Sequence, residues 1–226
     1  MRSITTHHHA RRLAVLGCAA LALVAAAGCS SSKSNPSGDI SGAQTTVPTV
    51  AASSTAPSST PTAPAGAPAV TLPADLKVTV QFPATGDATQ DAVAQGLTYA
   101  LRAYNSAFAK GDPQDAAFVY AYDGMARPYM ADIIGQLAKR NQTITGETRY
   151  YAPVITVKDT THAAATYCED ESKGYPKDKT SGQVQQSTPS VRDYTEWNLG
   201  LELSTQGVWR VTQALGEKGS TRCQNT

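Results

Sequence analysis

The stretch DATQDAVAQGLTYALRAYNSAFAKGDP, residues 87–113, decides the fold of this 226-residue chain. Large apolar side chains recur in it at steps of three and four residues, which places them on one face of an α-helix. We therefore expect a helix over residues 87–110, ended by Gly111. Asp112-Pro113 is typical of the start of a second helix, with aspartate at the N-cap and proline at the first helical position. The apolar stripe consists of Val93, Leu97, Leu101, Tyr104 and Phe108.

Beyond this stretch the pattern changes from helices to strands. The second helix is expected to reach Tyr122, and a third to end near Lys139-Arg140. Alternation of apolar and polar residues then predicts strands, and the polar residues 172–189 predict a long loop. A short strand is also expected before the first helix, over residues 76–82. The later strands are expected over residues 147–158, 162–170, 194–203 and 208–214.

This order of elements resembles the nuclear transport factor 2 superfamily, the cone-shaped α+β fold that is shared with ketosteroid isomerase and scytalone dehydratase. The resemblance covers residues 87–214. It rests on element order, on Lys110-Gly111-Asp112-Pro113 after the first helix, and on Gly207-Val208-Trp209-Arg210 in the final strand pair. It implies an α+β fold in which a long N-terminal helix and two shorter helices pack on a curved four-stranded antiparallel sheet. Many members of the superfamily only bind, whereas others are enzymes.

The start of the chain has the features of an export signal. Three arginines and no acidic residue occur within residues 1–12, and an apolar run follows from Leu13. A basic start, an apolar run and a cleavage site with small residues define a signal peptide, and this run is shorter than the ~20 residues of a membrane span. The final Ala26-Ala27-Gly28-Cys29 resembles the bacterial lipobox. That resemblance implies cleavage after Gly28 and a diacylglyceryl thioether on Cys29, often with palmitate on the new amine; the alternative is ordinary secretion with a free thiol.

Composition divides the chain into three parts. Residues 1–28 form the predicted lipoprotein signal peptide. Residues 29–73 are rich in Ser, Thr, Pro and Ala, and they predict a disordered linker because they hold too little apolar surface to offset the entropy of ordering. Residues 74–226 predict a single globular α+β domain, which at about 150 residues buries roughly 68–70% of its unfolded surface.

Charge and cysteine usage restrict the partners and the compartment. The leader contains three of the 19 basic residues and none of the 18 acidic ones, so the mature chain is close to neutral. A near-neutral domain lacks the basic surface that nucleic acid requires, so no nucleic-acid partner is expected. With Cys18 removed and Cys29 lipidated, Cys168 and Cys223 remain as a pair in an oxidising compartment and predict a disulfide. Two buried free thiols are the alternative.

Few side chains of the mature chain indicate chemistry. His162, its one histidine, is interpreted as a solvated strand end, with a pocket base as the alternative. Asp123 precedes a glycine in a sequence typical of a turn. Tyr104 carries a hydroxyl that suits a half-polar cavity. These three are the candidate pocket residues. Glu169-Asp170-Glu171 is interpreted as a solvated acidic loop rather than a calcium site.

Nothing in the sequence names a reaction, since GxSxG, P-loop and GxGxxG motifs are absent. We therefore expect a non-catalytic lipoprotein, held by lipid on the extracytoplasmic face of the cell membrane, without cofactor or metal. Its domain is expected to bind a small apolar ligand or an envelope protein. The alternative is an isomerase or dehydratase with His162 or Asp123 as base. A cavity with two or more inward ionisable groups would favour the enzyme.

Overall fold

The computed structural model describes residues 63–224, so the predicted signal peptide, Cys29 and most of the predicted linker lie outside the described residues. Within this range one sheet has the strand order β1-β2-β3-β4-β5. β1 pairs parallel with β2, and the other neighbouring strands pair antiparallel. The α+β class is confirmed. The predicted four-stranded antiparallel sheet is wrong, because the strand before the first helix joins it as a fifth, parallel member. The strands are β1 (Leu76–Val80), β2 (Gln142–Val157), β3 (His162–Asp178), β4 (Tyr194–Leu203) and β5 (Trp209–Lys218).

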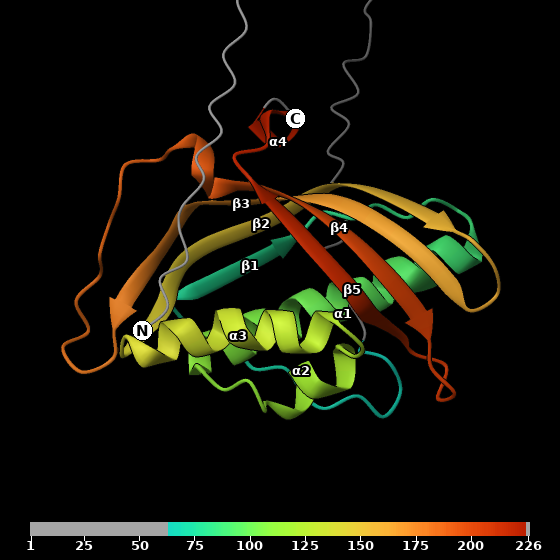
Figure 1. The fold of residues 1–226 in the computed structure, drawn as a ribbon, viewed down its shortest axis with the longest axis horizontal. Coiled ribbons are helices and arrows are strands. Elements are labelled where there is room, and N and C mark those ends of the chain that lie inside the picture. The colour runs from blue at the N-terminus through green and yellow to red at the C-terminus, as the bar shows by residue number, and fades with distance from the viewer. Residues whose placement is uncertain (1–62, 225–226) are drawn as a thin grey trace, which may run out of the picture. The chain divides into compact units, whose positions relative to one another are not determined.

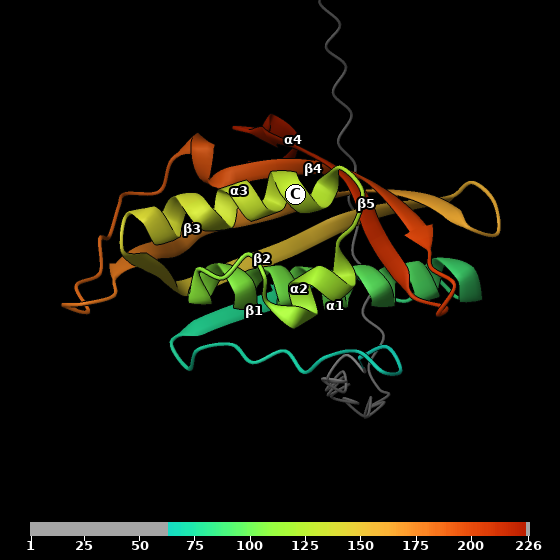
Figure 2. The ribbon, with the colours of Figure 1, turned by 60° about the horizontal axis from the view of Figure 1, so that its bottom comes forward.

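The helices are divided between the two faces of the sheet. Three of them lie together on one face, and the short C-terminal helix lies on the other (Figures 1 and 2). The first face is the core, where Leu97, Leu101 and Ile134 pack against Trp197 and Val211. The helices are α1 (Ala88–Lys110), α2 (Ala116–Ala121), α3 (Ala126–Lys139) and α4 (Thr221–Gln224), with a 3-10 turn, η1 (Val191–Asp193), before β4.

α1 has the limits that the sequence predicts. The Asp87 side chain accepts hydrogen bonds from the backbone N–H groups of Thr89 and Gln90, which caps the first turn. At the other end Gly111 adopts a left-handed conformation with φ of 68°. A side chain rarely adopts this geometry, which explains why the helix ends at a glycine.

α2 begins later than predicted. Its N-cap is Asp115, whose carboxylate accepts from the N–H groups of Ala117 and Phe118. The same carboxylate lies 2.6 Å from Lys110 Nζ, so an ion pair to the end of α1 holds it in place. Asp112 instead accepts from Gln114 N–H in the turn between the helices. The start predicted at Asp112-Pro113 is therefore wrong, because the second aspartate in this turn has the better partners.

The long loop predicted for residues 172–189 is only partly a loop. β3 continues to Asp178 and pairs with β2 from Gln142 onward. Gly146, with φ of 95°, lies opposite Gly174, and a Cβ at Gly146 would come 2.1 Å from the Lys173 carbonyl oxygen. The polar sequence suggested a loop, but backbone pairing across a glycine contact extends both strands. This pairing begins at Gln142, close after the end of α3 at Lys139.

The folded domain begins before the predicted boundary at residue 74. Residues 63–73, assigned to the linker from their composition, lie along α1, and Ala67, Val70 and Leu72 are partly buried against the hydrophobic core. Tyr99 donates a hydrogen bond of 2.8 Å to the Pro68 carbonyl, and Ser106 donates one of 3.0 Å to the Thr71 carbonyl. These hydroxyl groups satisfy backbone carbonyl groups of the segment, and the hydrogen bonds help to order it despite its composition.

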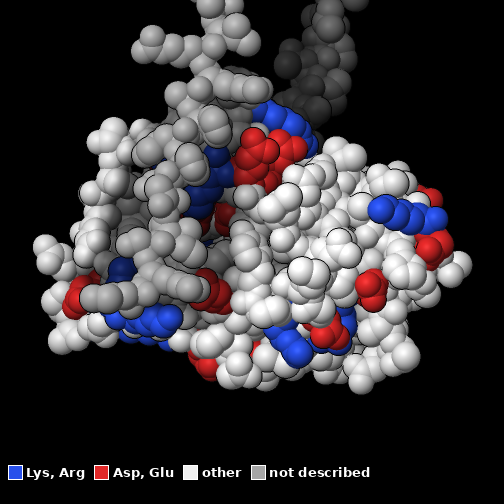
Figure 3. All heavy atoms as spheres, in the orientation of Figure 1, with Lys and Arg blue, Asp and Glu red and all other residues white. Residues whose placement is uncertain are grey.

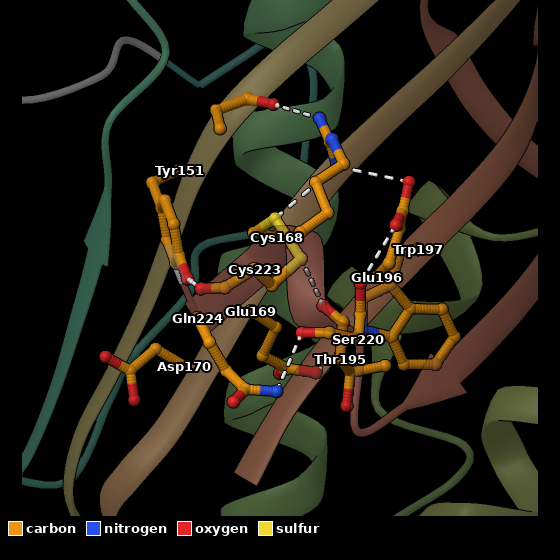
Figure 4. The surroundings of a disulfide bond; sticks show 12 residues. Tyr151, Cys168, Glu169, Asp170, Thr195, Glu196, Trp197, Ser220, Cys223 and Gln224 are labelled. Carbon is orange, nitrogen blue, oxygen red and sulfur yellow. Dashed lines mark hydrogen bonds and ion pairs between the residues drawn. A yellow bond between two sulfur atoms is a disulfide. The ribbon is translucent and has the colours of Figure 1, made fainter. Parts of the chain in front are cut away.

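α4 is attached to the sheet through Cys168 and Cys223, whose sulfur atoms lie 2.06 Å apart (Figure 4). This is the pair expected from the cysteine count, at the bonding distance of a disulfide. Tyr151 adds a hydrogen bond from its hydroxyl to the Cys223 carbonyl, and Arg222 pairs with Glu196 at 3.2 Å. α4 is therefore held against β3 and β4, on the face of the sheet opposite the other helices (Figure 1).

The described surface carries mixed charges. On the face shown in Figure 3, acidic and basic side chains lie side by side, and neither sign forms a continuous area. Among the helices of residues 63–224, none has the length and hydrophobicity of a membrane span.

Candidate functional site

A cavity of about 440 Å³ lies between the helices and the sheet. α1 and α3 form one wall, and β3, β4 and β5 form the other. Aromatic side chains make up most of the apolar lining, while charged side chains occur on the strands and at the end of α3. The lining residues are Tyr104, Phe108, Tyr129, Ile133, Gln136, Arg140, Glu169, Glu171, Thr195, Trp197, Gly216 and Lys218.

Strand register brings the polar residues of the cavity into one row. Tyr150 of β2 lies opposite Glu169 of β3, Glu169 opposite Thr195 of β4, and Thr195 opposite Lys218 of β5. Directly opposed residues on antiparallel strands point to the same face with Cβ atoms about 5 Å apart. The row therefore begins at Tyr150, which is buried in the core, and continues along the cavity wall through Glu169 and Thr195 to Lys218.

Glu169 is a buried carboxyl group on this row, with 5% of its surface exposed. Trp197 Nε1 donates a hydrogen bond of 2.7 Å to Glu169 Oε2 (Figure 4). Tyr150 also hydrogen-bonds to the carboxyl group, and its own hydroxyl accepts from Asn105 Nδ2 at 2.7 Å. Burial, with repulsion from Glu171, raises the pKa of Glu169 from 4.5 to about 8 despite these hydrogen bonds. The group therefore holds its proton at neutral pH.

Thr195, beside Glu169, has a hydroxyl without a partner. The residue is 2% exposed, and Oγ1 makes no hydrogen bond to any residue in the range 63–224. Among residues 63–224 it is the only buried side-chain polar atom that lacks a hydrogen-bond partner. An unsatisfied buried hydroxyl costs about 1–3 kcal/mol, so on a cavity wall it is a polar group that a bound water or ligand can satisfy.

Tyr104 lines the cavity from the helix side, as the sequence suggested. Its ring stacks on Phe108, with centroids 5.6 Å apart and planes 11° apart. Burial raises the pKa of Tyr104 well above 10, so its hydroxyl stays protonated and can donate a hydrogen bond. Across the cavity, Tyr129 meets Trp197 edge to face with centroids 6.5 Å apart. Four aromatic rings thus surround the space above the polar row.

The mouth of the cavity carries charges that have their own partners. Lys218 Nζ lies 3.3 Å from Glu171 Oε2, and both side chains are partly exposed. Arg140, at the end of α3, donates from Nε to Gln142 Oε1 at 3.0 Å. These groups meet solvent, whereas Glu169 and Thr195 lie at the inner end.

The other two candidate pocket residues lie outside the cavity. His162, 54% exposed on its side chain, contacts Asp159 through Nδ1 at 2.9 Å in the β2–β3 turn. Asp123, 42% exposed, accepts from Arg210 Nη1 at 2.6 Å and fastens β5 to the end of α2. Neither is among the lining residues. The geometry gives each a local structural role.

Sequence reasoning missed Glu169. The acidic stretch at residues 169–171 was interpreted as a solvated loop, which is wrong, because it lies within β3 and Glu169 faces the core. The signal was present in the alternation: Ala163, Ala165 and Tyr167 are buried at every second position, and Glu169 continues that series. Among residues 63–224, no group of three or more His, Cys, Asp or Glu side chains is arranged to hold a metal ion.

A further hollow of about 530 Å³ lies between Phe82 and the start of α1. Its acidic residue, Asp91, already accepts from the backbone N–H and the hydroxyl of Thr85 at 2.7 and 2.8 Å. Another, of about 460 Å³, lies over Thr166 and Asn198 on the outer face of the sheet. Neither contains an unsatisfied buried polar group, so the cavity between α1, α3 and the sheet is the candidate site.

No protein-family model and no curated protein matches the sequence. Several solved structures resemble the chain. A ketosteroid isomerase-like protein from Erwinia carotovora atroseptica SCRI1043 has 16% identity and a TM-score of 0.41, over 59% of this chain and 98% of that one. A nuclear transport factor 2-like superfamily protein from Salmonella enterica serovar Typhimurium LT2 has 14% identity and a TM-score of 0.40, over 59% and 95%. The intermembrane space region of chloroplast protein ARC6 has 14% identity and a TM-score of 0.38, over 60% and 99%.

One of these neighbours is described as a member of the nuclear transport factor 2-like superfamily and another as ketosteroid isomerase-like. At these identities and TM-scores the similarities give this chain no activity. The residues of the cavity must therefore carry the functional argument.

Proposed function

We propose that the protein is a lipid-anchored lipoprotein of the extracytoplasmic face that binds a small, largely apolar ligand between α1, α3 and the sheet. The observation that carries the binding proposal is the unsatisfied hydroxyl of Thr195 on the wall of an aromatic cavity of about 440 Å³. Ligand pockets of this kind combine an apolar lining with a few convergent polar groups. The anchoring proposal rests on the sequence of residues 1–29.

Filling the cavity tests binding. The processed protein in nanodiscs of zwitterionic lipid is titrated with 1-naphthalenemethanol, a neutral aromatic alcohol, and empty nanodiscs give the background. We expect saturable binding at one site that weakens at least tenfold in Ile133→Trp, since the larger side chain occupies the space. Val154→Trp, at an exposed position of β2, is the matched control and should bind normally. Equal binding by both variants would refute the cavity as the site.

The anchor has a separate test. Mass spectrometry of the membrane fraction should find an N-terminal peptide that begins at Cys29 and carries lipid, and Cys29→Ala should move the protein out of that fraction. An unmodified peptide at this position would overturn the anchoring proposal without affecting the binding proposal.

An enzyme of the isomerase or dehydratase kind is a second candidate. Glu169 and Tyr104 are two ionisable groups that line the cavity, which is the arrangement we expected of an enzyme. A carboxyl group with a pKa near 8 is poised for proton transfer at neutral pH. We rank binding first because the high pKa of Tyr104 makes it a donor rather than a base, and Glu171 and Lys218 pair with each other at the mouth, which leaves Glu169 as the buried acid–base group of the cavity.

Proton exchange distinguishes the two functions. If Glu169 acts as a base, the protein should catalyse exchange of the α-protons of 2-tetralone, an enolisable aromatic ketone, with deuterium oxide above the buffer rate. Glu169→Gln should abolish the catalysed exchange. A binding protein should leave the exchange rate at the buffer value.

A further inference from the structure

Two polar groups at the inner end of the cavity lack the partners that their chemistry calls for. Glu169 is a buried carboxyl group that forms no ion pair with residues 63–224, and its neighbour Thr195 has a free Oγ1 atom. The nearest basic residue along the same row, Lys218, already pairs with Glu171. In the free protein Glu169 is neutral at pH 7, and its ionised form calls for a compensating cation. Within residues 63–224, no side chain supplies that positive charge at Glu169.

An ammonium group on a ligand can satisfy both Glu169 and Thr195. An ammonium group carries a positive charge and several N–H donors, so it can pair with the Glu169 carboxylate and donate to Thr195 Oγ1 at once. The two residues are directly opposed on β3 and β4, so a single small head group reaches both. A neutral hydroxyl would leave the carboxyl group uncharged, and an anionic head would face Glu169 and Glu171 together.

The walls above this pair suit the same group. Tyr104, Phe108, Tyr129 and Trp197 surround the space, and aromatic faces attract cations by about 0.5–2 kcal/mol per contact, most strongly where water is excluded. Ile133 of α3 adds an aliphatic side chain to this lining. The expected occupant therefore has a cationic head at the inner end and an apolar body.

We propose that the cavity binds an organic ammonium compound, whose cationic head pairs with Glu169 and donates a hydrogen bond to Thr195. This inference rests on the proposed binding function and names the chemical class of its ligand. It also assigns Glu169 a role in recognition rather than in catalysis.

Binding of such a cation is linked to loss of a proton. Because burial holds the pKa of Glu169 near 8, the carboxyl group is protonated at pH 7 and must ionise to pair with an ammonium group. The other titratable groups that act on it are neutral phenols or lie toward the mouth. They are Tyr104 of α1, Tyr122 after α2, Tyr150 of β2, Tyr167 and Glu171 of β3, and Lys218 of β5.

A matched series of probes tests the proposal. The processed protein in zwitterionic nanodiscs is titrated calorimetrically at pH 7 with 1-naphthylmethylamine, 1-naphthalenemethanol and 1-naphthoic acid, which share one apolar body and carry a cationic, a neutral and an anionic head. We expect the amine to bind at least tenfold more tightly than the alcohol, and the acid to bind most weakly. Titration in two buffers of different ionisation enthalpy should show release of close to one proton per amine bound, and none per alcohol.

Two variants and one control assign the effect to residues. Glu169→Gln keeps the shape of the side chain and should remove both the tenfold preference and the proton release, while the alcohol binds as before. Thr195→Val should weaken the amine several-fold and leave proton release intact. Glu202→Gln, an exposed carboxylate at the far end of β4, is the control and should change neither.

The outcomes separate this inference from the proposed function. If the alcohol binds as tightly as the amine, or if Glu169→Gln keeps the preference for the amine, the cation proposal is overturned and the binding function stands. If none of the three probes binds, both fail. An amine preference that is lost in Glu169→Gln together with its proton release supports the proposal.

Discussion

Gly216 of β5 lies directly opposite Trp197 of β4, and the absence of a side chain at Gly216 gives the indole its place. A Cβ atom at Gly216 would come 3.0 Å from Trp197 Cη2 and within 3.2 Å of two further ring atoms. In this position Trp197 Nε1 reaches Glu169 Oε2 at 2.7 Å. A glycine on the neighbouring strand thus decides which way the indole points and which group it binds.

Gly216→Ala should therefore disturb the cavity. The added methyl group pushes the indole away from β5, which strains the core and lengthens the bond to Glu169. Overpacking of this kind costs about 1–3 kcal/mol. We expect a lower urea midpoint at unchanged m-value, and a shifted NMR signal for the Trp197 indole N–H.

Gly135→Ala in α3 is the matched control. A Cβ there meets nothing within 4 Å, and alanine in a helix interior is more stable than glycine by about 0.5–1 kcal/mol. This variant should raise the free energy of unfolding. A destabilised Gly135→Ala, or an unshifted indole signal in Gly216→Ala, would contradict the assignment of close contact to Gly216 and of open space to Gly135.

Arg210 should be the side chain on which the junction of α2 with β5 depends. Its Nε donates to the Tyr120 carbonyl, its Nη2 to the Val119 and Tyr122 carbonyls, and its Nη1 to Asp123. Because a charged donor in a planar fork makes these bonds, Arg210→Ala should lose roughly 2–3 kcal/mol, and Arg210→Lys should recover little of it. Thermal or urea unfolding measures the difference.

Asp123→Asn should cost less, at about 0.5–1 kcal/mol, because Asp123 is partly exposed and the three carbonyl contacts of Arg210 remain. It should also leave probe binding in the cavity unchanged, as should His162→Ala. If either substitution weakened probe binding tenfold, the placement of these two residues outside the site would be wrong.

The sequence predicted those elements whose signals are local. α1 follows from its apolar stripe and from Asp87 and Gly111 at its ends, and β4 follows from alternation through Trp197, Leu199 and Leu201. The long-range pairings were not predictable in this way. β1 joins the sheet through a parallel pairing across 70 residues, Leu76 with Gly146. Residues 63–73 are ordered by contacts with distant residues, through hydroxyls on α1 that bind their carbonyl groups and through apolar side chains packed on the core.

The candidate site was predicted only through Tyr104. Glu169 lies in an acidic stretch, and acidic residues are usually exposed to solvent. Its burial depends on strand register, because the β3 pairing places it between Tyr150 and Thr195. The same register aligns Thr195 with Lys218. Side chains from β2, β3, β4 and β5 lie side by side here. The residue pattern of a single strand does not show which residues of the other strands lie beside it.

Loss of the disulfide should destabilise the domain strongly. The two cysteines are 55 residues apart, and in the chain-entropy model a loop of that size contributes about 4 kcal/mol. The variant with Cys168→Ala and Cys223→Ala should therefore unfold at a much lower urea concentration, and reductant should have no further effect on it. Tyr151→Phe, which removes only the hydrogen bond to the Cys223 carbonyl, should cost about 1 kcal/mol. A wild-type midpoint that is insensitive to reductant would contradict the bridge.

The stability of the domain should fall as pH rises from about 5 to about 8. Burial raises the pKa of Glu169 from 4.5 to about 8, so within this window the folded state keeps a proton that the unfolded state releases. The free energy of unfolding then decreases with pH, at a limiting slope of about 1.4 kcal/mol per pH unit, and levels off above the folded-state pKa of Glu169.

Hydrogen bonds to Lys177 and Lys77 lower the pKa of Asp75 and Glu147, so the contributions of these two carboxylates to stability are lost only at more acidic pH. Urea unfolding of the wild type and Glu169→Gln at each pH isolates the effect, because the other groups cancel in the difference. The wild type should lose stability relative to the variant as pH rises, and a difference that stays constant from pH 5 to 8 would show that Glu169 is not a buried, protonated acid.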